Sequence, residues 1–240
     1  MKIGIICASD EELDPFLPLI KNSKLTNKAM LTFYEGQIHH LNVVALYSGV
    51  CKVNAAIASQ ILIDQFRVDL IINSGVAGGI HPQLELFDIV ISTEVCYHDV
   101  AFDILTEFHP WMKSIFFEAD KQFIQLSKLA ASKMKTTNKI YWGRMVTGES
   151  FITSKQRQKI EKKFAPLTTD METASIAHVC YVNQLPFISI RCITDNAAHS
   201  GKNNFEKNCA KASMIAKDFT ISLLDEIEMN LLKTKKSTSS

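Results

Sequence analysis

The sequence lacks long apolar runs and lacks an excess of charge of either sign, and each absence excludes a class of protein. Its 240 residues include no apolar stretch of about eighteen or more, the length that a membrane-spanning helix needs. Lys and Arg number 26 against 25 Asp and Glu, which leaves a net charge of +1. A near-neutral chain argues against a general nucleic-acid binder, which needs a basic surface to neutralise phosphates, and against a polybasic membrane anchor.

The short motifs that mark metal and nucleotide sites are also missing. No two of the six cysteines form a Cys-x-x-Cys motif, and the histidines show no zinc spacing. Buried reduced thiols are therefore expected in place of disulfides or a metal site. The glycine-rich segment 75–79 fails the dinucleotide pattern because Ala77 and Ile80 stand where glycines are required, and no Walker A sequence occurs.

No low-complexity linker or internal repeat divides the chain, and 47% of its residues are hydrophobic. We therefore expect one folded domain over residues 1–232, followed by a basic, Ser-rich tail over 233–240 that frays. The apolar run at residues 1–6 is too short for the core of a signal peptide, and acidic residues follow it closely. That pattern favours a cytoplasmic protein.

Segments with strand and helix character alternate along the chain. Residues 2–8 form a short apolar run, which indicates a buried strand, whereas 53–66 carries apolar residues at helical spacing. This alternation predicts an α/β fold with a mainly parallel sheet covered on both faces. The other expected strands are 30–34 and 40–48, paired as a hairpin about residues 35–37, then 69–74, 87–96, 139–147 and 187–193; the other expected helices are 11–21, 120–135, 155–163, 173–182 and 204–232.

Acidic and glycine-rich segments follow several of these strands, where ligands bind in such folds. Asp10-Glu11-Glu12 either caps a helix or supplies a carboxylate that accepts a proton from water. Asp195 is either a turn residue or a desolvated acid that holds its proton. Asp170-Met171-Glu172 is another acidic helix start or a second carboxylate site. Residues 74–79 form either a tight turn or a backbone that approaches a ligand closely.

Two further segments are open to two interpretations. His98 and Asp99 could act as an acid–base pair, but adjacent strand residues point to opposite faces, so structural hydrogen bonds are favoured. Residues 100–117 are rich in aromatic side chains with no clean period. Such a loop is typical of a lid or a subunit contact, and the alternative is a buried excursion over the sheet edge.

As a set, ordered segments along nearly the whole chain resemble the nucleoside phosphorylase/nucleosidase superfamily, and more closely the 5′-methylthioadenosine/S-adenosylhomocysteine nucleosidases. No single segment is specific, but their order and spacing are. The matching segments are 1–6 with Glu11-Glu12, then 48–56, 73–79, 97–99, 147–152, 170–174 and 191–195.

The resemblance implies a single-domain, three-layer α/β/α sandwich around a mixed, twisted sheet, assembled as a homodimer. It implies irreversible hydrolysis of the N-glycosidic bond of a small nucleoside, 5′-methylthioadenosine or S-adenosylhomocysteine, with release of adenine for methionine salvage. It implies no cofactor or metal and no nucleic-acid or membrane partner. The chemistry agrees, since cleavage develops an oxocarbenium-like sugar while the leaving purine needs a proton, a task for two carboxyl groups in opposite protonation states.

Carried over by position, Glu12 would be the base that activates water and Asp195 the acid that protonates adenine N7. Phe151 would stack on adenine, the Ile152 backbone would bind its edge, and Glu172 would hold a ribose hydroxyl. The other implied substrate positions are Ala8, Ser9, Val50, Val76, Gly78, Met171, Arg191 and Phe205, with Phe102 and Leu105 lent to the pocket of a neighbouring subunit.

The sequence departs from the family pattern at two places that bear on specificity. Residues 100–105 lack the Gly-Tyr pair that usually follows Ala-Phe, which affects the pocket for the 5′-substituent. Val76 replaces a small hydroxyl residue, so a hydrogen bond near Asp195 or the water is lost.

Three alternatives stay open. One is a nucleosidase for a bulkier 5′-adduct such as 6-amino-6-deoxyfutalosine. Another is a phosphorylase, although three acids after the first strand would repel phosphate. The last is a receiver-like signalling domain, although the chain is about twice as long as a typical receiver domain.

Overall fold

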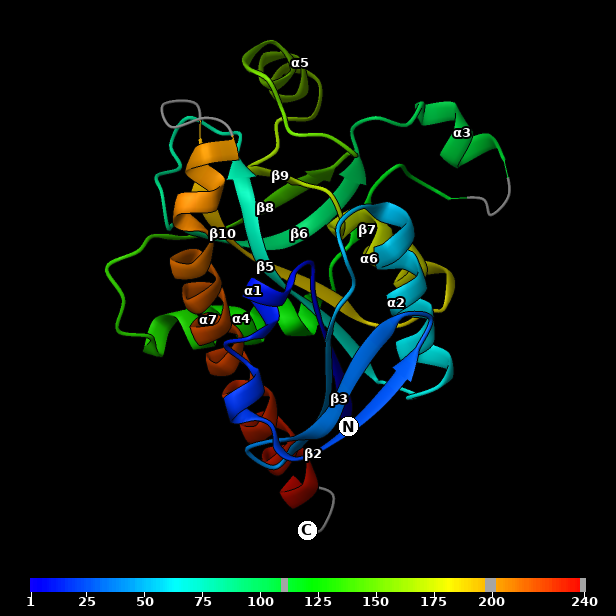
Figure 1. The fold of residues 1–240 in the computed structure, drawn as a ribbon, viewed down its shortest axis with the longest axis vertical. Helices are drawn as coiled ribbons and strands as arrows, with labels where there is room; N and C mark the ends of the chain where they lie inside the picture. Colours follow the sequence, from blue (N-terminus) through cyan, green and yellow to red (C-terminus); the bar gives the residue numbers. More distant parts are fainter. Residues whose placement is uncertain (109–111, 197–201, 238–240) are drawn as a thin grey trace.

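The computed structural model describes residues 1–108, 112–196 and 202–237 and has an α/β architecture (Figure 1). In this part of the chain ten strands join in one mixed sheet with helices on both sides, which confirms the predicted fold class. The strands are β1 (Lys2–Cys7), β2 (Lys21–Lys28), β3 (Leu31–Ile38), β4 (Leu41–Tyr47), β5 (Leu70–Gly79), β6 (Ile89–Tyr97), β7 (Phe117–Glu118), β8 (Ile140–Thr147), β9 (Thr168–Asp170) and β10 (Phe187–Asp195). The helices are α1 (Asp10–Leu13), the 3-10 turn η1 (Leu17–Leu19), α2 (Lys52–Asp64), α3 (Phe102–Glu107), α4 (Lys121–Lys133), α5 (Ser154–Phe164), α6 (Thr173–Val182) and α7 (Lys202–Ser237).

The sheet has a parallel centre and an antiparallel margin. β1 pairs in parallel with β4 and β5, and β5 pairs in parallel with β10. From β10 the pairing runs through β6, β8 and β9 back to β5, so these five strands close into a ring. β3 and β2 extend the other side by antiparallel pairing. The carboxyl ends of β1, β5 and β10 therefore lie next to one another.

Two helical layers bury the two faces of the sheet. α2 and α6 pack together on one face, whereas α1, α4 and α7 share the other (Figure 1). Strand β1 is apolar at almost every position because both of its faces are covered. Its Ile6 joins the core beneath α2 with Leu62, while Ile5 joins the core beneath α7 with Phe219.

Most expected elements are confirmed, but the expected helix over 11–21 is wrong. α1 stops at Leu13 and η1 follows, because Pro15 and Pro18 cannot donate the hydrogen bonds that a continuous helix requires. The chain then enters β2, an exposed polar edge strand without the apolar alternation that would have marked it. Exposed lysines on an edge strand oppose pairing with other chains. The hairpin of β3 and β4 is confirmed, but the expected turn at residues 35–37 is wrong. Those residues belong to β3, which runs to Ile38, and β4 begins at Leu41.

The glycine-rich segment after residue 74 is strand, so the tight-turn interpretation is wrong. β5 continues to Gly79 because β10 pairs with it through Val76, Ala77 and Gly78. At the other end of the chain, α7 runs to Ser237, beyond the expected Leu232, and residues 238–240 lie outside the described part. No helix among the described residues is long and apolar enough to cross a membrane.

Candidate active site

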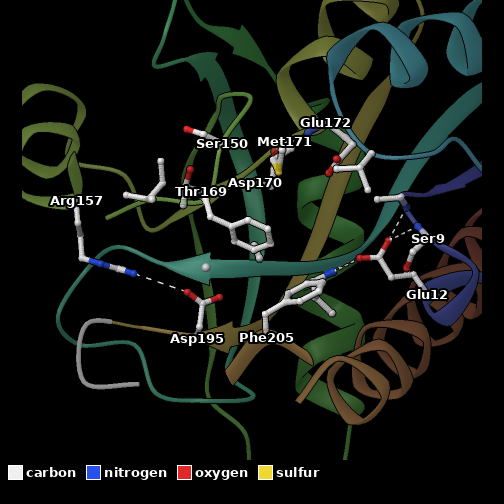
Figure 2. A pocket seen from close by; sticks show the side chains of 17 residues that line it. Ser9, Glu12, Ser150, Arg157, Thr169, Asp170, Met171, Glu172, Asp195 and Phe205 are labelled. Atoms are coloured by element: carbon white, nitrogen blue, oxygen red, sulfur yellow. Dashed lines mark hydrogen bonds and ion pairs between the residues drawn. The ribbon is translucent and has the colours of Figure 1, made fainter. Parts of the chain in front are cut away.

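A pocket of about 220 Å³ opens at the carboxyl ends of β1, β5 and β10. Figure 2 shows its polar groups in two sets, with Glu12 and Glu172 at one end and Asp195 beside Arg157 at the other. Twelve of the thirteen catalytic and substrate positions predicted for one chain line this pocket, and Arg191 lies beneath it. The lining residues are Ala8, Ser9, Glu12, Val50, Val76, Ala77, Gly78, Ser150, Phe151, Ile152, Arg157, Thr169, Asp170, Met171, Glu172, Asp195 and Phe205.

Glu12 projects from the first turn of α1 and is 3% exposed. Its Oε2 accepts the backbone N–H of Ala8 at 2.5 Å and that of Ser9 at 3.4 Å, and its Oε1 accepts the N–H of Val76 at 2.8 Å. Burial raises the pKa of Glu12, whereas nearby Arg191 and these three N–H groups lower it. The carboxyl group is therefore fixed in place and poised to exchange a proton.

Gly75 on β5 makes room for this carboxylate. A Cβ at position 75 would collide with both carboxylate oxygens of Glu12. The glycine is thus required for close approach and not for a turn, since β5 is extended here.

Arg191 is the fully buried cation beneath the pocket. Its guanidinium lies 3.9 Å from Glu12 Oε1, 3.3 Å from Asp170 Oδ2 and 3.5 Å from Glu172 Oε2. It also donates to the Val76 carbonyl at 3.1 Å. One charge shared by three carboxyl groups explains why the sequence can place so many acids at these strand ends.

Asp170 and Glu172 both lie at the start of α6, but their carboxyl groups make different contacts. Asp170 Oδ1 accepts the N–H groups of Glu172 at 3.1 Å and Thr173 at 3.0 Å, as a capping residue does. Glu172 Oε1 accepts the Cys51 N–H at 3.0 Å, and its side chain faces the pocket. Burial raises the pKa of Glu172 to about 7, with Arg191 lowering it and Asp170 raising it. The capping interpretation of this triplet is therefore confirmed for Asp170, and Glu172 is placed where the second carboxylate of a site would lie.

Asp195 ends β10 at the opposite side of the pocket. Its Oδ1 accepts a hydrogen bond from the Thr194 hydroxyl at 3.1 Å, and its Oδ2 lies 3.8 Å from Arg157 Nη2 (Figure 2). Burial raises the pKa of Asp195, whereas Thr194 and Arg157 lower it. Gly78 lies beside the carboxyl group, where a Cβ would stand 3.3 Å from Oδ2.

An apolar wall joins the two polar ends. The rings of Phe151 and Phe205 meet edge to face at 5.8 Å, with Phe205 on α7. Phe151 is 53% exposed and lines the pocket, so part of its ring is accessible to a ligand. Val76 offers no hydroxyl to the site, and Thr194 and Arg157 supply the polar contacts of Asp195.

Phe102 and Leu105 do not line the pocket of their own chain. Phe102 on α3 packs against Phe164 at 5.6 Å, and Leu105 packs against the core beneath α2.

Asp99 accepts hydrogen bonds from Lys52 Nζ at 2.7 Å and from the Glu149 N–H at 3.1 Å. Those contacts confirm the structural hydrogen bonds expected for Asp99, whereas the buried Nε2 of His98 has no partner among the described residues. Of the aromatic segment 100–117, residues 109–111 lie outside the described part, as does Ala197 after β10.

Five lining residues were not among the predicted substrate positions: Ala77, Ser150, Arg157, Thr169 and Asp170. Ala77 and Asp170 do lie in segments that the sequence singled out as candidate sites. Arg157 lies in a helix whose polar sequence predicts a solvent-exposed surface, and its position in that sequence does not indicate that it is buried. Thr169 on β9 is 8% exposed, and its hydroxyl meets no partner among the described residues. Asp170 carried a signal, since an acid directly before a helix N-terminus is a capping candidate. Across the described chain no group of three or more His, Cys, Asp or Glu side chains is arranged for a metal ion.

Comparison with known proteins connects this geometry to a family. The sequence model of the phosphorylase superfamily matches residues 2–225. A 5′-methylthioadenosine/S-adenosylhomocysteine nucleosidase of Oceanobacillus iheyensis is 37% identical over 95% of this chain and 100% of its own length. This chain belongs to that nucleosidase family of the phosphorylase superfamily.

Solved structures agree with the family assignment. The nucleosidase of Colwellia psychrerythraea, determined in complex with adenine, matches with a TM-score of 0.86 and 32% identity over 94% of this chain and 95% of that one. A futalosine hydrolase mutant of Helicobacter pylori matches with a TM-score of 0.87 and 26% identity over 94% and 99%. The family's fold is thus shared by nucleosidases with different named substrates.

Proposed function

We propose that this chain hydrolyses the N-glycosidic bond of 5′-methylthioadenosine and S-adenosylhomocysteine, releasing adenine and a 5-thio-substituted ribose. Glu12 takes a proton from the attacking water, and Asp195 gives a proton to adenine N7. The observation that carries the proposal is the placement of two carboxyl groups, the buried Glu12 and the partly buried Asp195, at opposite ends of one apolar pocket (Figure 2). Nucleosidase relatives at 37% identity support it.

The two ends suit the two halves of the substrate. Breaking the bond develops positive charge on the sugar, and carboxylates near the sugar stabilise that charge. Glu12 and Glu172 supply them at one end, where Glu172 accepts a ribose hydroxyl in a charge-assisted hydrogen bond. Met171 lies at the same end, while Phe151 stacks on the base and the Ile152 backbone binds its edge.

Water fits the site better than phosphate as the nucleophile. A phosphorylase must hold a dianion beside the first strand, and here that position is taken by the buried Glu12. Arg191, the nearby cation, is already shared by Glu12, Asp170 and Glu172. A phosphate would have to displace one of these carboxylates from its partner.

The 5′-substituent is the part of the substrate for which a second candidate has support. A futalosine hydrolase has the same fold over 94% of this chain. Residues 100–105 also lack the family's usual Gly-Tyr pair. The second candidate is therefore 6-amino-6-deoxyfutalosine, with the same cleavage at the same carboxyl groups.

The proposal extends to assembly as a homodimer. Apolar side chains stay exposed on α2 and α3: Val53 at 67%, Ile57 at 43% and Ile104 at 50%. A second copy that covers them would bring Phe102 and Leu105 to its partner's 5′-pocket. A mass in solution of twice 26.9 kDa is expected, and a monomer at micromolar concentration would contradict it.

The proposal also places the enzyme in the cytoplasm, in methionine salvage. All six cysteines are unpaired, and five of them are buried, as the sequence predicted. Unpaired thiols are the usual state of cysteine in the cytosol. The adenine and 5-thio-ribose products are those that such a salvage route consumes.

The test is a panel of 5′-substituted adenosines with adenine release as the readout, run with and without inorganic phosphate. We expect phosphate-independent release from 5′-methylthioadenosine. Glu12→Gln and Asp195→Asn should each lower kcat by about 10²–10⁴-fold while the variants still fold. Strict phosphate dependence would refute the hydrolase, and either variant above about a tenth of the wild-type rate would refute its assigned role.

A further inference from the structure

Helix α5 carries one buried cation on an otherwise exposed polar surface. Arg157 is 6% exposed, whereas Lys155 and Lys159 on the same helix are exposed. Ile160 and Phe164 anchor the helix on an apolar cluster beside β8. Burying a guanidinium costs solvation, so its partners must compensate for that cost.

The guanidinium of Arg157 reaches from α5 to the end of the sheet. Its Nη1 donates to the Gly79 carbonyl at the end of β5. Its Nη2 lies 3.8 Å from Asp195 Oδ2, and Figure 2 shows the side chain directed at this carboxyl group. The Thr194 hydroxyl holds the other oxygen, Oδ1, at 3.1 Å. The carboxyl group of Asp195 is thus held from two sides.

These contacts act on the charge state of Asp195. Burial raises the pKa of Asp195, which keeps a proton available, while Arg157 and Thr194 favour the carboxylate. Burial lowers the pKa of Arg157, and the charges of Asp195 and Glu161 raise it. The cation therefore gains most when Asp195 becomes negative.

We propose that Arg157 is a positioning residue that stabilises the Asp195 carboxylate formed as the proton passes to the leaving base. The proposal rests on the proposed function. In the step concerned, the electron pair of the C1′–N9 bond stays with the base, and the proton of Asp195 goes to N7. Water adds to C1′ and loses a proton to Glu12, so adenine leaves neutral and Asp195 is left as an anion beside Arg157.

The valine at position 76 offers a reason why Asp195 is contacted by a cation from α5. A hydroxyl at residue 76 could hold the acid from β5, but valine has no donor. Arg157 reaches the same carboxyl group from α5, and its rigid planar donor group suits a carboxylate. The Thr194 hydroxyl and the charge of Arg157 both lower the pKa of Asp195.

The experiment compares R157Q with K159Q, an exposed cation on the same helix. R157Q should lower kcat for 5′-methylthioadenosine by about 10–100-fold, which is less than the full loss expected when a general acid is removed. K159Q should change kcat less than about twofold. The alkaline limb of the pH profile of R157Q should move to higher pH, because Asp195 loses the cation that lowers its pKa. An unmoved limb together with an unchanged kcat would overturn the proposal.

A second substrate separates acid catalysis from general disruption. The 4-nitrophenyl 5-methylthioriboside has a leaving group that needs no proton. R157Q should cleave it within about threefold of the wild-type rate, and an equal loss on both substrates would show that α5 merely shapes the pocket. If the wild type does not cleave this probe, the alkaline limb decides alone.

R157K guards against a folding defect, because it keeps the charge that R157Q removes. It should keep the wild-type alkaline limb and recover at least about a third of the kcat that R157Q loses. An R157K as impaired as R157Q, with the limb displaced equally, would overturn the role of the charge. Failure of the wild type to release adenine would instead refute the proposed function, which keeps the two claims distinguishable.

Discussion

Replacing Arg191 by methionine removes the cation that three buried carboxyl groups share while keeping a long side chain. The guanidinium lies 3.9, 3.3 and 3.5 Å from the carboxylates of Glu12, Asp170 and Glu172. At an effective dielectric constant of about 20, each contact contributes about 4–5 kcal/mol of Coulomb attraction. Desolvation of the buried ions offsets most of this sum, so the expected loss of unfolding free energy is about 3–5 kcal/mol.

The pH dependence identifies the cause of that loss. Without Arg191, the pKa values of Glu12 and Glu172, already raised by burial, rise further. The folded state then keeps protons that the unfolded chain releases, so folding stability falls as pH rises through this range. The deficit of R191M relative to the wild type should be larger at about pH 8 than at about pH 5, where Glu172, with a pKa of about 7, is protonated in both proteins.

Urea unfolding followed by circular dichroism at both pH values measures this deficit. Lys139→Met is the matched control, because it breaks a 3.7 Å ion pair to Glu85 in which both side chains are more than half exposed. Surface pairs of that kind contribute less than about 1 kcal/mol. A deficit of R191M that is the same at both pH values would refute the electrostatic argument and leave only a packing role.

Two further predictions concern single groups of the site. The pKa of Glu172 is about 7 in the folded protein against 4.5 ordinarily. As the pH rises from 4.5 to 7, this group alone should therefore lower the unfolding free energy of the wild type by about 3 kcal/mol. E172Q should abolish that slope in urea titrations, and an unchanged slope would contradict the assignment. G75A places a Cβ against the carboxylate of Glu12. It should lower kcat at least about tenfold by displacing the base, and a near-normal kcat would show that the displaced carboxylate still activates water.

The sequence predicts most of the sheet because the buried strands are encoded by their own composition. β1 is an almost continuous apolar run and five of the nine residues of β10 are apolar, which indicates strands covered on both faces. β2 could not be predicted in this way, because seven of its eight residues are exposed and Leu25 is its one apolar residue. It becomes a strand through its pairing with β3. α1 shows the opposite error, where acidic and apolar residues suggest a helix that two prolines interrupt.

At the site, the rule that ligands meet strand ends brings Glu12, Glu172 and Asp195 to one pocket, as predicted. Arg157 escapes that rule because it reaches the pocket from a helix. Its neighbours Lys155 and Lys159 are exposed, so local sequence gives no reason to separate it from them. Its burial is decided by the distance between α5 and β10, which is a property of the assembled fold.

The net charge of +1 conceals a local excess of acid that bears on the reaction. Four acidic side chains, Glu12, Asp170, Glu172 and Asp195, line the pocket, and two arginines, Arg157 and Arg191, contact them, which leaves a formal excess of two negative charges. Burial raises the pKa of three of the acids, so the site can hold protons in place of further cations. A site of this kind repels a phosphate dianion but favours a sugar that becomes positive, and the raised pKa of Asp195 favours the protonated acid that the leaving base needs. The same excess therefore supports both water as the nucleophile and an uncharged or zwitterionic nucleoside as the substrate.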